Sequence, residues 1–292
     1  MLQISELYIY PIKSLPGISL TKALVTDRGF EHDRRWMLVD ENNIFLSQRL
    51  TPVMTQLLPS LEGEGIRVTD KRNADSILIP FKTDHSDKKA KTAVVVWDDT
   101  CAAEYVGDEA DAWFSKALGF GCRLVHMPED SRRVVDQQYA PGDNITSFSD
   151  AYPFLVIGQA SLDELNSRIA NPLPMNRFRP NIVFTGGVAF EEDITAHFTL
   201  NKIDFYGVKL CARCPIPTID QNTGSRGKEP LKTLAKYRQR DNKVYFGQNL
   251  IHHGEGFISV GDELQVKKQH TDARFIINSL KPMITEIDKT LV

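Results

Sequence analysis

The sequence contains little cysteine and has no strong bias of charge, and both features narrow the classes of protein to consider. Only four of its 292 residues are cysteine, too few for a disulfide scaffold in a chain of this length. We therefore expect a reducing, cytoplasmic location. The net charge is −3 and the isoelectric point about 6.2, so electrostatics favours neither nucleic acid nor a membrane as a partner.

Long apolar runs are also missing. Stretches such as 154–158 (FLVIG) and 93–97 (AVVVW) are much shorter than the roughly 20 residues that a membrane-spanning helix needs. Residues 1–14 (MLQISELYIYPIKS) lack a basic segment followed by an apolar run, so we expect no signal peptide. Their alternation of apolar and polar residues instead predicts a first β-strand.

The remaining pattern predicts a mainly β protein with some helix. Short strand-like runs recur through the first third of the chain, at 5–12, 18–27, 35–40, 44–49, 65–70, 76–81 and 92–106. Strands at this spacing indicate an antiparallel barrel or sandwich. Residues 108–119 have apolar residues at helical spacing and end on Gly119, which predicts a helix that stops there.

The second half is expected to be β-rich as well. A buried strand near 152–158 leads into a helix in which Ser161 and Glu164 have the spacing of a capping box. Residues 198–214 predict a hairpin with its turn near Tyr206–Gly207. Further expectations are a long loop near 127–150, of a length that is often functional in a compact domain, a strand after Arg179 and a helix at 229–239. We also expect strands with a Gly-Asp turn over 244–266 and an amphipathic helix within 275–287.

A C-x-x-C pair, Cys211 and Cys214, lies in the segment CARCPIPTIDQNTG. A structural zinc site needs four ligands, yet Cys101 and Cys122 are isolated in the sequence. A redox pair normally opens a helix, whereas Pro-Ile-Pro follows here. Two readings are stronger: small buried residues in a turn, or one thiolate that binds a soft metal beside Arg213, a cation that would lower the pKa of the thiol.

Several polar residues at strand ends suit an anionic heterocycle. Lys13, Ser14, Arg34 and Arg49 stand in loops or at strand ends, where they could hold a phosphate, although surface loops often carry charge without a ligand. Further candidates are two amides and the arginine that opens a strand, namely Asn181, Gln248 and Arg179.

Together these segments resemble the MOSC family, and within it the YcbX-like and mitochondrial amidoxime-reducing proteins. The resemblance extends to about Val266 and rests on an ordered set of segments: YPIKS, DRRWMLVD, SFSDAYP, QASLDELN, NRFRPNIV, AFEED, CARCPIPTIDQNTG, EPLKTL, FGQN and VGDE. It implies a MOSC N-terminal β-barrel domain at 1–120, a MOSC β-barrel domain at 121–268 and a C-terminal tail or linker at 269–292.

The resemblance also implies a molybdenum cofactor, Mo-molybdopterin, with Cys214 as the protein ligand to the metal and Arg213 as its catalytic neighbour. Lys13, Ser14 and Arg34 match positions that hold the cofactor phosphate. The positions that line the pterin are matched by Asp150, Arg179, Asn181 and Arg213. We add Gln248 to the cofactor-binding set. The family description also includes pyridoxal phosphate binding.

The implied activity is two-electron reduction of N-hydroxylated compounds such as amidoximes, hydroxylamines and hydroxylaminopurines. Many YcbX-like proteins carry a C-terminal ferredoxin domain, but no cysteine follows Cys214 here. We therefore expect an external electron donor, a ferredoxin- or flavin-type reductase, and no nucleic-acid or membrane partner. The alternatives are a cofactor-binding or sulfur-carrier module without reductase activity, and a non-catalytic binding protein.

Overall fold

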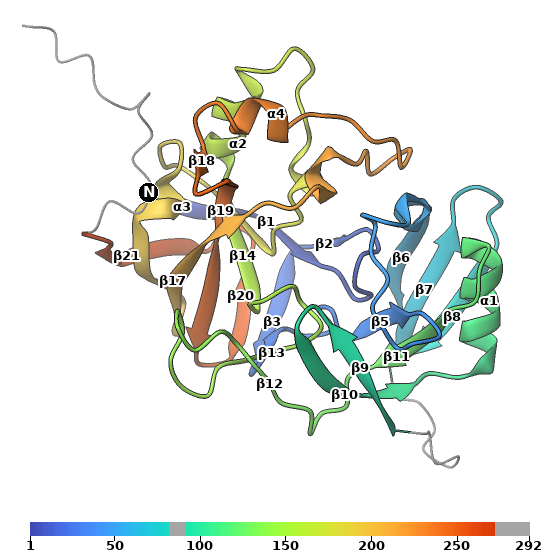
Figure 1. Cartoon of the computed structure of the whole chain (residues 1–292). Helices are drawn as coiled ribbons and strands as arrows, with labels where there is room; N and C mark the ends of the chain where they lie inside the picture. The colour runs from blue at the N-terminus through green and yellow to red at the C-terminus, as the bar shows by residue number, and fades with distance from the viewer. Residues whose placement is uncertain (82–90, 272–292) are drawn as a thin grey trace, which may run out of the picture.

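The computed structural model describes residues 1–81 and 91–271, and its largest part is a closed seven-stranded β-barrel (Figure 1). Hydrogen bonds between β19 and β14 close the ring. Around the barrel the order is β14 (Phe154–Gly158), β15 (Ile182–Thr185), β1 (Leu2–Ile9), β21 (Glu263–Gln269), β16 (Thr195–Leu200), β17 (Ile203–Ala212) and β19 (Lys243–His253).

Strand β1 belongs to this barrel although it comes first in the sequence. It lies antiparallel to β15, with Leu7 opposite Ile182, and antiparallel to β21, with Leu2 opposite Leu264. The barrel therefore combines residues from both sides of the domain division expected at residue 120.

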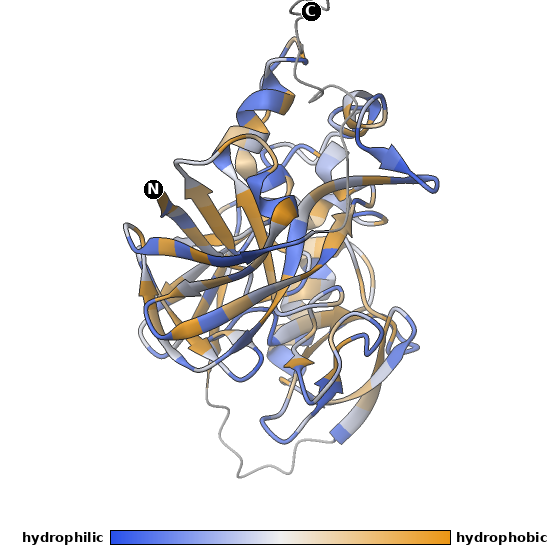
Figure 2. Cartoon of the chain, turned by 90° about the vertical axis from the view of Figure 1, so that its left-hand side faces the viewer, coloured by the Kyte–Doolittle hydropathy of each residue, from blue (hydrophilic) through white to orange (hydrophobic). Residues whose placement is uncertain are grey.

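Hydrophobic residues recur along the barrel strands (Figure 2), and their buried side chains fill the barrel. Phe198 and Phe205 are stacked with their ring centroids 5.3 Å apart, and Phe154 meets Phe205 edge to face at 5.4 Å. All three are buried, and such close packing restricts strand movement. The core thus provides a rigid support for the loops at the strand ends.

The first half forms an open half-barrel beside the closed barrel (Figure 1). Helix α1 (Asp108–Leu118) packs on it through Ala110, Phe114 and Leu118, and ends at Gly119, whose φ is +82°. The half-barrel sheets consist of β5 (Trp36–Val39), β11 (Arg123–His126), β10 (Asp99–Tyr105) and β9 (Lys91–Val96), and of β6 (Leu57–Glu62), β7 (Gly65–Asp70) and β8 (Ser76–Pro80). The predicted mainly β fold with two barrel-like parts is confirmed.

Short elements connect and cover these sheets. The strands are β2 (Ile18–Leu20), β3 (Lys22–Thr26), β4 (Gly29–Phe30), β12 (Arg133–Val134), β13 (Ile145–Thr146), β18 (Gln239–Arg240) and β20 (Gly256–Ser259). The helices are α2 (Gln159–Asn166), α3 (Glu191–Ile194), α4 (Leu231–Leu234), η1 (Pro52–Gln56), η2 (Met175–Arg177) and η3 (Ile216–Thr218). No helix in the described residues is long and apolar enough to cross a membrane.

The turn predicted at Tyr206–Gly207 is wrong. The hairpin turns at Asn201–Lys202, where Asn201 adopts a φ of +54° that asparagine tolerates. Gly207 lies inside β17 beside an irregularity in its pairing with β19. A Cβ at Gly207 would stand 2.0 Å from Nε2 of Gln248. Glycine is therefore required here by close packing and not by a turn.

The predicted capping box is also wrong. Gly158, and not Ser161, is the N-cap of α2. The Ser161 hydroxyl is buried, donates to the Glu192 carboxylate at 2.7 Å and accepts from the Phe190 amide at 2.7 Å. Tertiary contacts thus use the side chain that the local pattern assigned to the helix start.

Other local predictions had mixed outcomes. Residues 44–49 form no strand and contribute only isolated bridges at Ile44 and Phe45. The helix predicted at 229–239 shortens to α4, whereas the 127–150 loop and the Gly261–Asp262 turn occur as expected. The helix predicted within 275–287 and most of the expected tail lie outside the described residues.

Candidate functional site

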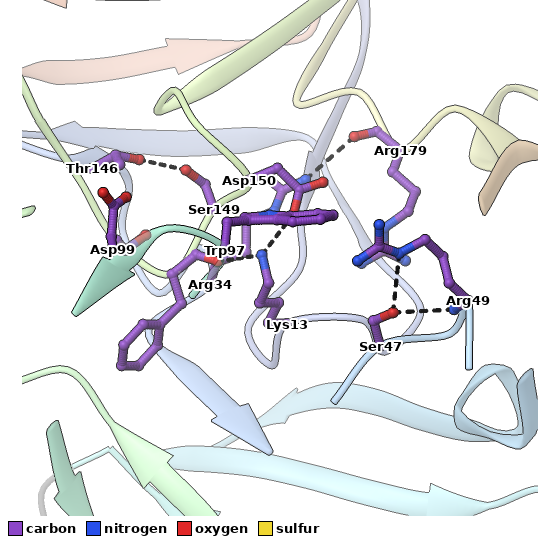
Figure 3. A network of polar contacts seen from close by, with 12 residues as sticks. Lys13, Arg34, Ser47, Arg49, Trp97, Asp99, Thr146, Ser149, Asp150 and Arg179 are labelled. Atoms are coloured by element: carbon purple, nitrogen blue, oxygen red, sulfur yellow. Dashed lines mark hydrogen bonds and ion pairs between the residues drawn. The ribbon is translucent and has the colours of Figure 1, made fainter. Parts of the chain in front are cut away.

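Lys13 and Ser14 follow β1 at the junction between the barrel and the half-barrel. Nζ of Lys13 is buried and donates to Oδ1 of Asp150 at 2.7 Å and to the Phe148 carbonyl at 2.8 Å (Figure 3). Burial lowers the pKa of Lys13 to about 8 against the opposing effect of Asp150. Ser14 is buried, and no hydroxyl hydrogen bond forms within residues 1–81 and 91–271. It is therefore a donor available to a ligand.

Arg34 and Arg179 both lie against the ring of Tyr10. Their Cζ atoms are 4.3 Å and 4.2 Å from its centroid, and the Tyr10 hydroxyl is fixed by donation to the Pro180 carbonyl at 3.0 Å. Tyr10 therefore holds two guanidinium groups close together despite their mutual repulsion, through cation–π contacts.

The two arginines differ in how much of their bonding capacity is used. Arg34 donates to Oδ2 of Asp33 at 2.6 Å and to Oδ1 of Asn181 at 3.0 Å. The Arg179 guanidinium makes no hydrogen bond or ion pair within the part of the chain that the structure describes. Burial lowers its pKa to about 10, and its φ is +56°. A buried, unpaired cation held in a strained backbone conformation indicates an anion site.

The amide of Asn181 is already used by the protein. Its Oδ1 accepts from Arg34 and from the Leu155 amide at 3.3 Å, and its Nδ2 donates to the Tyr8 carbonyl at 3.2 Å. Asn181 thus connects β1, β14 and Arg34. In this structure it positions Arg34 and has little capacity left for a ligand.

Asp150 is supplied by the irregular 127–150 loop. Buried Arg133 shapes this segment by donating to the carbonyls of Ser147 at 3.0 Å and Asp150 at 3.3 Å. Desolvation opposes ionisation, but Lys13 outweighs it and holds the pKa of Asp150 well below its usual range. The side chain is nevertheless 62% exposed, so this carboxylate can also meet a ligand.

Cys214 follows the end of β17, and its surroundings differ from those of Cys211. Cys211 packs against the apolar cluster around Phe178 and accepts from Nη1 of Arg213 at 3.2 Å. Burial raises the pKa of the Cys214 thiol, as does Asp150, whereas Arg213 and Arg49 lower it. The charges that act on Cys214 thus come from both parts of the fold. All four cysteines are free, so the C-x-x-C forms no disulfide.

Arg213 is anchored by a backbone carbonyl on the barrel side. Its Nη2 donates to the Phe178 carbonyl at 2.7 Å, while its Nε is buried without a hydrogen-bond partner. Buried donors are normally satisfied. An acceptor from a ligand would complete this one.

The loop after Cys214 is fastened at two places. Arg177 donates to Asp220 at 2.7 Å and to the Pro217 carbonyl at 3.3 Å. Gln221 and Gln48 exchange amide hydrogen bonds at 3.2 Å, which join this loop to the half-barrel. These contacts fix Cys214 at the junction of the two parts.

Gln248 is not brought to this cluster. It is fully buried in β19, and its Nε2 donates to the carbonyls of Glu192 at 2.6 Å and Thr195 at 2.7 Å. Its amide therefore holds α3 and β16 to the barrel wall.

Sequence reasoning missed Tyr10 and Trp97. Tyr10 lies within the YPIKS segment, but its role depends on tertiary contacts. Trp97 occupies a hairpin turn and donates from Nε1 to Oδ1 of Asp150 at 3.2 Å (Figure 3). The signal for it was a tryptophan in VVVWDDT, at a turn between two strand-like runs.

The cluster suits a phosphate-bearing heterocycle joined to a soft metal. Ser14, Arg179 and Nε of Arg213 offer unused donors, and the Cys214 thiol lies within electrostatic reach of Asp150 and Arg213. No group of three or more His, Cys, Asp or Glu residues that could hold a metal occurs within 1–81 and 91–271. A metal at Cys214 would therefore need most of its ligands from a cofactor.

Comparison with known proteins identifies the family. Residues 1–120 match the MOSC N-terminal beta barrel domain, and residues 143–265 match the MOSC domain. The chain is 30% identical to mitochondrial amidoxime-reducing component 1 of Homo sapiens over 285 residues, which cover 91% of this chain and 83% of the relative. This chain belongs to the MOSC family and resembles its amidoxime-reducing components.

A second group of relatives shares the same region. Identity to the molybdenum cofactor sulfurase of Homo sapiens is 28% over 294 residues, covering 92% of this chain but 33% of the sulfurase. Mitochondrial amidoxime reducing component 2 of Bos taurus is 31% identical, over 82% of this chain and 73% of the relative. The function of this MOSC protein is thus related to the molybdenum cofactor.

Proposed function

We propose that this chain is a molybdenum-cofactor-dependent reductase of N-hydroxylated compounds: amidoximes, hydroxylamines and hydroxylaminopurines. The observation that carries the proposal is a set of unused donors, on Ser14 and Arg179, at a junction that also holds the half-buried thiol of Cys214. Anionic groups bind where donors are preorganised and desolvated. The amidoxime-reducing relatives favour this activity.

In this proposal each residue has a separate task. Ser14, Arg179, Lys13 and Arg34 bind the cofactor phosphate, Cys214 is the protein ligand to the metal, and the unsatisfied Nε of Arg213 receives an acceptor from the pterin. When bound, the cofactor supplies the two-electron chemistry that removes oxygen from an N–OH group. Asp150 keeps buried Lys13 charged near neutral pH, and Asn181 orients Arg34. An external ferredoxin- or flavin-type protein donates the electrons; a cytoplasmic location stays a prediction.

The test compares the two cysteines of the C-x-x-C. Protein produced with molybdate should contain near-stoichiometric molybdenum and pterin, and should reduce an amidoxime with a chemical electron donor. We expect Cys214→Ser to lose metal and turnover and Cys211→Ser, the matched control, to retain most of both. Equal losses in the two variants would contradict a single protein ligand.

A second function is favoured by the sulfurase relatives. The chain would then bind cofactor and carry sulfur as a persulfide on Cys214, without reducing N-hydroxylated substrates. Mass spectrometry of Cys214 distinguishes the two functions. A persulfide combined with no turnover would support the carrier and exclude the reductase.

A further inference from the structure

Trp97 adopts a backbone conformation that tryptophan rarely takes. Val96 pairs with Asp99, so Trp97 and Asp98 form the two-residue turn between β9 and β10. Of these two, only Trp97 has a positive φ, +59°. This is the pattern of a type II′ turn, whose first central position is ordinarily glycine. A bulky residue there is strained, and such strain is often found at functional sites.

Three contacts hold the indole over the candidate site. Its Nε1 donates to Asp150, the Arg49 Cζ lies 4.0 Å from its ring centroid, and the Phe45 ring centroid is 5.1 Å away. Figure 3 shows the indole beside the Lys13–Asp150 pair, with its ring extending toward Arg49. Trp97 is nevertheless 39% exposed. It therefore faces both the anion site and the solvent.

The chemistry that Trp97 offers to a ligand is stacking. Its only polar atom is already bonded to Asp150, so the exposed ring surface remains. An uncharged ring contributes little to phosphate binding, but it recognises planar aromatic groups. Trp97 also comes from the half-barrel, whereas Arg179 and Arg213 come from the barrel side. A ligand between these two sides would meet donors on one side and the indole on the other.

We propose that Trp97 is a specificity-determining residue that stacks on the aromatic part of N-hydroxylated substrates, an inference that rests on the proposed reductase function. It selects planar aromatic substrates over small aliphatic ones that carry the same reacting group. This role accounts for the strained φ of +59° at Trp97, because glycine would suit the hairpin turn better but has no ring to contact a ligand.

The first experiment uses benzamidoxime and acetamidoxime, which share the amidoxime group and differ in the ring. We expect Trp97→Gly to lower the ratio of kcat/KM for benzamidoxime to that for acetamidoxime by roughly tenfold, the scale of one aromatic contact. Trp97→Phe should restore most of the ratio. The Tm of Trp97→Gly should not fall, because glycine relieves the turn strain. An unchanged ratio in Trp97→Gly would overturn the inference while leaving the reductase function intact.

The second experiment needs no turnover. In cofactor-free protein, benzamidoxime should quench indole fluorescence saturably and acetamidoxime should not, and Trp97→Phe should remove the saturable component while Trp36 and Trp113 remain. If the wild type reduces neither amidoxime but quenching by benzamidoxime saturates through Trp97, the reductase function fails and the aromatic site stands. Quenching that is equal for both compounds, or unchanged in Trp97→Phe, would refute stacking at this site.

Discussion

Replacing Lys13 by methionine should make the protein more stable at neutral pH while weakening its anion site. Burial lowers the pKa of Lys13 from an ordinary 10.5 to about 8. Because one pKa unit corresponds to about 1.4 kcal/mol, keeping this lysine charged costs about 3 kcal/mol below pH 8. Methionine removes that cost but leaves the Phe148 carbonyl without its donor, which costs about 1 kcal/mol. Asp150 stays solvent-accessible, so the net gain is about 2 kcal/mol.

The pH dependence of stability tests independently whether burying the charged lysine destabilises the fold. Between pH 8 and 10.5 the unfolded chain still binds the lysine proton that the folded chain has released. The wild type therefore gains about 3 kcal/mol of stability as pH rises through this window. The advantage of Lys13→Met should vanish within the window and become a disadvantage of about 1 kcal/mol by about pH 10.5, because the Phe148 carbonyl still lacks its donor. Urea unfolding at pH 7 and pH 10 in phosphate-free buffer measures both effects.

Lys116→Met is the matched control, since Lys116 is exposed and forms only a surface ion pair with Asp75. It should change stability by less than about 0.5 kcal/mol. Binding of inorganic phosphate should weaken in Lys13→Met and not in the control. A Lys13→Met protein that is less stable than the wild type at pH 7 would refute the reasoning.

Three further outcomes are expected. Arg177→Met should lower the stability by about 2 kcal/mol, because it breaks a largely buried ion pair with Asp220. The same variant should contain less molybdenum than the wild type, and an equal metal content would contradict a role of Arg177 in holding Cys214. Gly207→Ala should lower the Tm by several degrees, because its Cβ would stand 2.4 Å from the Thr195 carbonyl. Gly121→Ala, at a position with open space and no positive φ, is the control and should have a much smaller effect. Burial, together with the charge of Asp193, raises the pKa of Glu192 to about 8. The wild type should therefore lose stability from about pH 5 to pH 8, because the unfolded chain releases this proton while the folded chain keeps it. Glu192→Gln should remove that loss, and an identical pH profile would argue against a protonated Glu192.

Sequence patterns predicted the local structure correctly where residues close together in the sequence determine it. The strands, the end of α1 at Gly119 and the Gly-Asp turn follow from periodicity and turn chemistry. They were misleading where distant contacts decided the result. Ser161 matched a capping pattern yet bonds to Glu192, and Gly207 resembled a turn residue yet makes room for Gln248.

The candidate site shows the same limit. The arginines, Lys13 and Cys214 were found because their residue types and family motifs point to an anion and a metal. Arg179 has a guanidinium without a hydrogen bond or ion pair in the described residues, whereas the amide of Asn181 is already hydrogen-bonded within the protein. This difference depends on partners more than 20 residues away in the sequence. Tyr10 and Trp97 act through ring contacts that one-dimensional spacing does not reveal.

The position of β1 in the barrel has a consequence for the order of assembly. Leu2 pairs with Leu264, so the ring cannot close until nearly all of the described chain has left the ribosome. Lys13 and Ser14 follow directly from β1, and their place beside Arg179 depends on that closure. Contacts this distant in sequence form late in folding. The candidate site is therefore complete only after β21 has been made, and a ligand of this site must enter a barrel that is already closed.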